Sequence, residues 1–241
     1  MADAPLILIP GLMCDAAVWE PLFPLLPPRL PCQVVDHGSA DSITEMAQRV
    51  LDAAPPAFAL AGHSMGGRVA LEVLRLASQR VQRLALLDTG YQARPSGPAG
   101  AEEARKRHAL LDLARRRGVR AMAREWVQGM VHPARLDEDP LVEAIVSMFE
   151  RKSADIFACQ IAALLARPDA TPVLACARVP ALVLCGRQDN WAPLSQHEEI
   201  AALMPGRPLL RVVDDAGHMS PMEQPRAVAQ ALLEWLGQAG S

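Results

Sequence analysis

A short apolar run, Phe58–Ala61, passes directly into Gly62-His63-Ser64-Met65-Gly66-Gly67, and a helical pattern follows at once. The spacing is G-x-S-x-G between a strand and a helix, which requires a tight turn with small residues on both sides of the serine. Such a turn lifts the serine Oγ clear of the sheet. It also places the next N–H, that of Met65, at a helix N-terminus, where developing negative charge is stabilised. The segment predicts that Ser64 is a nucleophile and that the Met65 N–H is an oxyanion donor.

Short apolar runs alternate with longer helical stretches, which is the signature of strand–helix–strand units with parallel strands. Most runs are continuously apolar, as strands buried on both faces should be. The sequence therefore predicts an α/β fold. The expected strands are Leu6–Ile9, Gln33–Asp36, Phe58–Ala61, Arg83–Leu87, Ala181–Cys185 and Leu209–Val213, and the expected helices are Ser42–Ala53, Gly66–Ser78, Gln196–Leu203 and Arg226–Leu236.

One long segment, from about Gln92 to Arg178, contains no convincing strand and is punctuated by glycine and proline. Its patterns predict four helices, Glu102–Arg117, Val119–Met130, Pro140–Lys152 and Ala154–Ala166. We interpret residues 92–178 as a helical cap inserted into a core formed by residues 1–91 and 179–241. A separate helical domain is the weaker alternative, because the strand pattern resumes after the segment.

Composition excludes several classes of protein. The 241 residues carry a formal net charge of −3, which gives no electrostatic footprint for nucleic acid. The five cysteines are odd in number and include no CxxC pair, so neither a disulfide framework nor a zinc finger is indicated. No basic residue precedes Arg29, and no apolar run approaches the ~18 residues of a membrane span. We expect a cytoplasmic protein with no membrane span, metal or cofactor.

A serine nucleophile needs a base, and the base needs an orienting acid; after this kind of turn the chain order is Ser, acid, His. His218 follows the run Leu209–Val213 in Asp214-Asp215-Ala216-Gly217-His218. The carboxyl ends of parallel strands meet at one sheet edge, so His218 is expected beside Ser64 and is the candidate base.

Two aspartates are candidates for the acid, since each follows a strand between Ser64 and His218. Asp189 lies in the longer loop Gly186–Pro193, which can carry a carboxylate outward. Asp88 follows its strand immediately and has less reach. Asp189 is therefore favoured, and Asp88 remains the alternative.

The loop after the first expected strand, Ile9–Asp15, can supply the second oxyanion donor. Gly11 lets the backbone approach the site closely, so the Leu12 N–H can face the Met65 N–H. Trp19, further along the same segment, and Met219, beside the candidate base, are candidates for lining the substrate pocket or for plain packing.

Together these segments resemble the α/β-hydrolase superfamily, in particular the small, capped carboxylesterase-like branch that includes pimeloyl-ACP methyl ester esterases and MenH-type enzymes. The resemblance implies an eight-stranded, mostly parallel sheet with helices on both faces and an acid after the strand that follows the cap, which supports Asp189. It also implies that Gln160 can face the active site, although an exposed helix face is an equal alternative for it. The matching residues are Ile9-Pro10-Gly11, Gly62–Gly67, Gly186-Arg187-Gln188-Asp189, Gly217-His218, Glu223 and Pro225.

The combined reading is hydrolysis of a carboxylic ester with a small or medium apolar acyl group, through Ser64, His218, Asp189 and two backbone donors. A thioesterase, a C–C bond hydrolase and a MenH-type lyase would use the same triad, and a slow-turnover ligand receptor could be built on the same fold. The expected partner is a small-molecule ester. Residues 101–126 carry eight basic and four acidic side chains, which fits either docking of an acyl-carrier or coenzyme A-linked substrate or a solvated helix.

Overall fold

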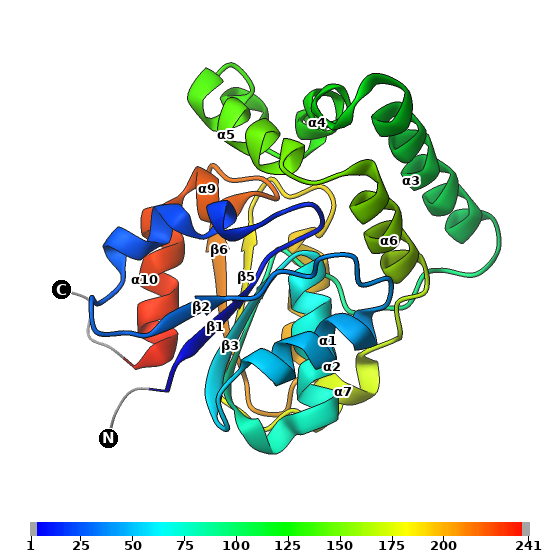
Figure 1. Cartoon of the computed structure of the whole chain (residues 1–241). Coiled ribbons are helices and arrows are strands. Elements are labelled where there is room, and N and C mark those ends of the chain that lie inside the picture. The colour runs from blue at the N-terminus through cyan, green and yellow to red at the C-terminus, as the bar shows by residue number, and fades with distance from the viewer. Residues whose placement is uncertain (1–3, 238–241) are drawn as a thin grey trace.

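The computed structural model describes residues 4–237, in which six parallel strands form one sheet covered by helices on both faces (Figure 1). The strand order is β2-β1-β3-β4-β5-β6, and every neighbouring pair is parallel. The predicted α/β class is confirmed. Each strand lies within two residues of its predicted bounds: β1 Leu6–Ile9, β2 Cys32–Val34, β3 Phe58–His63, β4 Val81–Leu87, β5 Ala181–Gly186 and β6 Leu209–Val213.

The expectation of eight strands is wrong for this chain, since residues 4–237 form a sheet of six. The count of eight came from the resemblance, whereas the residues themselves contain six apolar runs. Those six runs account for all six strands. The central strands β1, β3 and β5 are fully buried along their length, as parallel strands between two helical layers must be.

Helices cover the two faces of the sheet unequally. On one face lie α1, α2 and α7, and α10 lies on the opposite face (Figure 1). Packing contacts extend the first row from α7 to α8, and α10 packs against a 3₁₀ segment, η2 (Glu20–Leu25). The bounds of the first set are α1 Ile43–Ala53, α2 Met65–Ala77, α7 Thr171–Cys176 and α8 Leu194–Leu203; the C-terminal helices are α9 Ser220–Glu223 and α10 Pro225–Leu236. The short helices α7 and α9 were not predicted.

Local sequence explains where α1 begins and how it packs. The Ser42 Oγ accepts a hydrogen bond of 3.1 Å from the Glu45 N–H, which satisfies one of the free donors at the helix N-terminus. Its buried residues, which include Ile43, Met46 and Val50, recur at helical spacing and form one apolar stripe. That stripe packs against α2, and α2 in turn covers β3 and β4.

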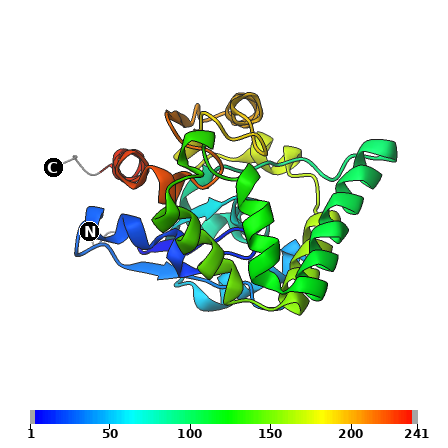
Figure 2. The ribbon, with the colours of Figure 1, turned by 90° about the horizontal axis from the view of Figure 1, so that it is seen from above.

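Five α-helices lie between β4 and β5. Besides the short α7 these are α3 (Gly97–Arg117), α4 (Val119–Trp126), α5 (Asp139–Glu150) and α6 (Ala154–Leu165). We refer to residues 97–165 as the inserted helices. In Figure 1 they lie above the carboxyl ends of the strands, and in Figure 2, which looks down on that end, they lie in front of the sheet. All four inserted helices were predicted, although α3 begins earlier than expected, at Gly97. None of the helices within residues 4–237 combines the length and apolarity needed to cross a membrane.

The strand order determines where a ligand can bind. The chain passes from β1 to β2 on one side and then returns to place β3 on the other side of β1. The loops after β1 and β3 therefore diverge at the carboxyl edge, and such a switch point is where α/β sheets bind ligands. The segment Pro10–Cys14 and the turn at Ser64 both lie at this point.

Candidate active site

Ser64 lies in a strained turn between β3 and α2, with φ 55° and ψ −119°. The turn needs glycine on both sides: a Cβ at Gly62 would lie 2.2 Å from the Gly66 carbonyl oxygen, and one at Gly66 would lie 2.2 Å from the Ile9 carbonyl oxygen. The Ser64 N–H donates to the Leu87 carbonyl at 2.9 Å. These contacts over-determine the backbone, so the hydroxyl is held in the strained position that the G-x-S-x-G pattern predicts.

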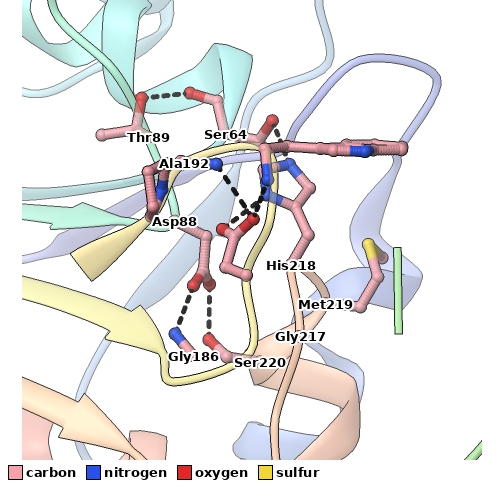
Figure 3. A network of polar contacts seen from close by, with 12 residues as sticks. Ser64, Asp88, Thr89, Gly186, Ala192, Gly217, His218, Met219 and Ser220 are labelled. Carbon is pink, nitrogen blue, oxygen red and sulfur yellow. Dashed lines mark hydrogen bonds and ion pairs between the residues drawn. The ribbon is translucent and has the colours of Figure 1, made fainter. Parts of the chain in front are cut away.

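Three side chains from three separate loops form one chain of hydrogen bonds (Figure 3). His218 Nε2 lies 2.8 Å from Ser64 Oγ, and His218 Nδ1 lies 2.8 Å from Asp189 Oδ2. The second Asp189 oxygen accepts from the backbone N–H groups of Trp191 (2.8 Å) and Ala192 (3.0 Å). Asp189 is therefore fixed by its own loop with one oxygen left for the imidazole.

The electrostatics of the pair follow from burial and contact. Burial alone would lower the pKa of His218, but the Asp189 carboxylate and its hydrogen bond outweigh burial and raise that pKa above 6.5. Burial alone would raise the pKa of Asp189, but His218 and the two loop N–H groups lower it below 3.8. The carboxylate therefore stays ionised, and the imidazole is a stronger base than an isolated histidine.

Asp88, the alternative acid, lies fully buried beneath the Asp189 loop. Its oxygens contact other groups: Oδ1 accepts from the Gly186 N–H at 2.8 Å, and Oδ2 accepts from the Ser220 hydroxyl (Figure 3). Burial and the nearby Asp189 charge raise the pKa of Asp88 well above its usual range. Asp88 thus holds the base of the loop together, and Asp189 is the aspartate in contact with His218.

Glu223 holds the loop that carries the imidazole, a role that sequence reasoning did not assign. Its Oε1 accepts from the Gly217 N–H (2.9 Å) and the Met219 N–H (3.1 Å), on either side of His218. Its Oε2 accepts from the His132 N–H at 2.7 Å, in the segment that joins α4 to α5. One buried carboxylate therefore ties this loop to the inserted helices.

His63 and Met130 restrain His218 from two further directions. The His63 ring contacts the His218 carbonyl through Nε2 at 2.8 Å, and burial lowers the pKa of His63 to about 3, so this ring is neutral and donates. The His218 N–H donates to the Met130 carbonyl at 2.6 Å. Both backbone groups of His218 are thereby used, one by the core and one by the inserted helices.

Two backbone N–H groups are free to bind a developing oxyanion. Leu12 and Met65 both line the cavity beside Ser64. Within residues 4–237, neither of their N–H groups donates to a protein acceptor. The Met65 N–H is also the first of α2, so the positive end of that helix dipole adds to its effect.

A cavity of about 460 Å³ opens at Ser64 and extends beneath the inserted helices. Its lining side chains are of two kinds. The apolar ones, which we call the apolar wall, are Leu110, Trp126, Phe149, Phe157, Ile161 and Leu164. The basic ones, which we call the basic wall, are Arg68, Lys106 and Arg107, with Glu103 as their acidic neighbour. The cavity can therefore hold an apolar chain with an anionic group.

Aromatic side chains connect the acid loop to the inserted helices at the cavity mouth. Trp191, two residues after Asp189, stacks on Trp126 of α4 with centroids 5.6 Å apart and an interplanar angle of 24°. Trp191 also contacts the imidazole of His218, and the two ring centroids lie 5.0 Å apart. Trp191 is 40% exposed, whereas Trp126 packs inward on Phe149 and Phe157.

Of the three residues predicted to line the pocket, Met219 does so and the other two do not. Among residues 4–237, Trp19 is fully buried and packs edge-on against His63 instead of facing the cavity. Gln160 is also fully buried, and its Oε1 accepts from the Met13 N–H at 2.8 Å. The pocket expectation for Gln160 is corrected, because the docking of α6 directs this side chain to the backbone of the loop after β1. For Trp19, the packing alternative is the one that the structure has.

The residues that sequence reasoning missed come mainly from the inserted helices, whose docking angle no periodicity reveals. Arg68 is the exception: it lies four residues after Ser64 on α2, and helical spacing places it one turn away on the same face. No cluster of three or more histidine, cysteine or carboxylate side chains in the part of the chain that the structure describes could hold a metal ion.

Comparisons with known proteins agree with this architecture. Residues 6–231 match the alpha/beta hydrolase family, and the chain therefore belongs to that family. A pimeloyl-[acyl-carrier protein] methyl ester esterase from Photobacterium profundum is 32% identical over 96% of this chain and 94% of its own length. A thermophilic esterase from Thermogutta terrifontis, solved with malate bound, has a TM-score of 0.84 at 28% identity, covering 99% of this chain and 91% of that one. An enol-lactonase from Burkholderia xenovorans LB400 shares the fold, with a TM-score of 0.81 at 23% identity, covering 98% and 92%.

Proposed function

We propose that this alpha/beta hydrolase is a serine esterase that cleaves a carboxylic ester through an acyl-enzyme. The observation that carries the proposal is the pair of 2.8 Å contacts from Ser64 Oγ to His218 Nε2 and from His218 Nδ1 to Asp189 Oδ2. Together with a strained serine turn and two free N–H groups, this is the arrangement that acyl transfer requires. The esterase relatives support the same reaction class.

In the proposed reaction Ser64 Oγ attacks the ester carbonyl while His218 Nε2 takes the hydroxyl proton. Asp189 keeps the Nδ1 proton in place and stabilises the imidazolium that forms. The carbonyl oxygen becomes an oxyanion between the N–H groups of Leu12 and Met65. His218 then protonates the leaving alcohol, and a water molecule, deprotonated by the same imidazole, releases the acid from Ser64.

The inserted helices act in this proposal as a cap that defines the acyl pocket. Helices α4, α5 and α6 supply Trp126, Phe149, Phe157 and Ile161, which give the pocket its apolar wall. A cavity of about 460 Å³ has room for a small or medium acyl group and part of the alcohol. This supports an apolar acyl chain next to the scissile bond.

The basic wall favours a substrate that also bears an anionic group. Glu103 is shared by two arginines, accepting from Arg107 at 2.9 Å and from Arg167 at 2.7 Å and 2.9 Å. Arg68 donates to the Gln92 carbonyl and has no carboxylate within ion-pair distance among residues 4–237. Burial is the main cause that lowers the pKa of Arg68 to about 9; Arg167 and Arg107 lower it further, while Glu103 and Asp169 oppose them. An ester carrying a carboxylate or the phosphate of an acyl-carrier arm would supply the missing charge, and a thioester of such an arm is the second candidate substrate.

Covalent labelling tests the nucleophile. A fluorophosphonate should modify one serine rapidly, and Ser64→Ala should abolish both the label and the hydrolysis of p-nitrophenyl esters, with kcat falling by roughly 10⁴–10⁶. The control Ser78→Ala, at an exposed position after α2, should label normally. Labelling that persists in Ser64→Ala would refute the assignment.

Matched substrates test the anionic preference. Monomethyl and dimethyl esters of one dicarboxylic acid differ only in the free carboxylate, and acyl thioesters and C–C substrates assayed beside them separate the alternative reactions. Arg68→Gln should lower kcat/KM for the monomethyl ester by about 10–100-fold, the value of one or two charge-assisted hydrogen bonds, and leave the dimethyl ester nearly unchanged. The control Arg75→Gln removes an exposed guanidinium on the same helix, which pairs with the buried Glu72 outside the cavity, and should affect neither ester. Equal losses for both esters would contradict the preference.

A further inference from the structure

Helix α6 of the inserted helices contacts the backbone of the loop that carries the Leu12 N–H. The Gln160 side chain reaches from α6 to the loop after β1, where its Oε1 accepts from the Met13 N–H at 2.8 Å. Its Nε2 donates to the Gly38 carbonyl at 3.4 Å. Gln160 is completely buried, so these contacts are made without competition from water.

The loop that Gln160 contacts is a tight turn. The Cys14 N–H donates to the Gly11 carbonyl at 3.1 Å, which closes a four-residue turn with Leu12 and Met13 at its centre. Met13 has φ 62°, the left-handed value that a type II turn requires at its third position. Glycine or asparagine is usual there, and a larger side chain in this conformation has an energetic cost. Something must stabilise the turn against that cost.

The bond from Gln160 fits that requirement. It uses the N–H of the residue with positive φ, which is buried and would otherwise be left without an acceptor. On the other side of the turn, His37 contacts the Pro10 carbonyl through Nε2 at 2.8 Å, and burial lowers the pKa of His37 to about 4, so the neutral ring donates. The backbone from Pro10 to Met13 is thereby held at both ends.

The held segment lies directly against the nucleophile. A Cβ at Gly11 would lie 3.1 Å from both His63 Nδ1 and Ser64 Cβ. Between the two anchored residues, Pro10 and Met13, lies Leu12, whose N–H is free and whose side chain lines the cavity. A change in the turn would therefore move the Leu12 N–H relative to the oxygen of a bound ester.

We propose that Gln160 is a positioning residue for the oxyanion hole: its carbonyl oxygen fixes the Met13 N–H and so keeps the Leu12 N–H aimed at the reacting carbonyl. The proposal rests on the function proposed above. It adds that the inserted helices complete the catalytic machinery from behind, through a side chain that touches no substrate. The position of the Leu12 N–H then depends on two parts of the chain, the loop after β1 and helix α6.

The test uses Gln160→Met, which keeps the volume and removes the acceptor. Loss of one oxyanion donor costs about 10²–10³-fold in kcat, and a misaligned donor should cost about 10–100-fold, with KM changed less than about twofold. A trifluoromethyl ketone, which forms a tetrahedral adduct with the serine, should lose affinity by the same factor as kcat/KM. The corresponding methyl ketone should bind as before.

Two variants separate positioning from general damage. Gln160→Glu can still accept from the Met13 N–H and, when protonated, can donate to Gly38, so it should retain at least about a third of the activity. Gln128→Met, at an exposed position between α4 and α5, should match the unmodified protein. The kinetic constants and the ketone affinities are compared only for variants that unfold cooperatively and whose Ser64 is labelled normally by a fluorophosphonate. If Gln160→Met does not fold, Gln160→Leu takes its place.

Three outcomes would overturn the inference: full kcat in Gln160→Met, a loss found entirely in KM, or equal loss of affinity for both ketones. These outcomes differ from failure of the proposed function. In that case Ser64→Ala would still hydrolyse esters, or no serine would label at all, whichever residue stands at position 160.

Discussion

Replacing each of the two strand-end aspartates by asparagine distinguishes their roles. In Asp189→Asn, the backbone N–H groups of Trp191 and Ala192 still find an acceptor in the amide oxygen. The amide NH₂ then faces His218 Nδ1, which can no longer carry its proton. The imidazole adopts the other tautomer and presents N–H, instead of a lone pair, to Ser64 Oγ.

The magnitude follows from what is lost. One charge-assisted hydrogen bond of 2.8 Å is worth about 1.5–3 kcal/mol, and the base is also held in the wrong tautomer. We expect kcat to fall by about 10³–10⁴, which corresponds to roughly 4–5.5 kcal/mol in the barrier. Removing the carboxylate also lowers the pKa of His218, so the residual activity should extend to lower pH.

Asp88→Asn should behave differently. Burial and the Asp189 charge already favour the neutral form of Asp88, and an amide is a close substitute for a protonated carboxyl. Its partners, the Gly186 N–H and the Ser220 hydroxyl, can both still bond to an amide. We expect less than a tenfold loss in kcat. The assay is kcat for a p-nitrophenyl ester as a function of pH, normalised to the fraction of Ser64 that labels. The reverse ranking of the two variants would make Asp88 the acid and refute the geometric argument.

Three further predictions concern charge. First, kcat/KM should rise with pH through an apparent pKa above 6.5, because His218 must be neutral to act as the base; a rate that is flat from about pH 5 to 9 would contradict this. Second, Glu223→Gln should lower kcat by about 10–100-fold, because it places an amide donor against a backbone N–H group, and should move the pH profile to lower pH, because it removes a negative charge near His218. The exposed Glu138→Gln is the control, and an unchanged profile in Glu223→Gln would count against the role of Glu223. Third, burial alone would raise the pKa of Glu103, but Arg167 and Arg107 lower it from 4.5 to about 2. The ionised Glu103 therefore contributes about 2–3 kcal/mol to the free energy of unfolding above pH 4.5, and this contribution is lost as the pH falls towards 2. Glu103→Gln should show this loss in urea unfolding at pH 7, and equal stability there would refute it.

The sequence was most informative where a general rule of chain geometry says which residues, far apart in the sequence, lie close together in the fold. Parallel strands end at one edge of the sheet, so residues that follow β3, β5 and β6 could be expected together before any coordinates were known. This reasoning brought Ser64, Asp189 and His218 into one hypothesis, and the structure has them in hydrogen-bond contact. The G-x-S-x-G turn was equally readable, because Gly62 is required by a contact inside the motif and Gly66 by its close approach to the end of the neighbouring strand β1.

The sequence was least informative where two elements pack together at an angle that the sequence of neither element determines. Gln160 shows the difficulty: its position on a helix was predicted, but whether it faced substrate, solvent or backbone depends on how α6 rests on the loop after β1. For Trp19 the sequence left pocket lining and packing equally open, and the structure has it packed on His63. Glu223 matched a family pattern, yet its three backbone N–H partners come from segments about 90 residues apart.

The bonds that join the inserted helices to the catalytic loops have a kinetic consequence. Swinging these helices away as one body would break the contacts of Gln160 with Met13, of Met130 with His218 and of Glu223 with His132. In the proposed mechanism an opened form would be inactive, and each turnover by that route would include a rearrangement on the microsecond-to-millisecond timescale. Trp191 offers a faster entrance, because it is 40% exposed at the cavity mouth and is held there mainly by ring stacking. Rotation of one indole takes place in nanoseconds, so traffic of substrate and product need not limit the rate of this enzyme.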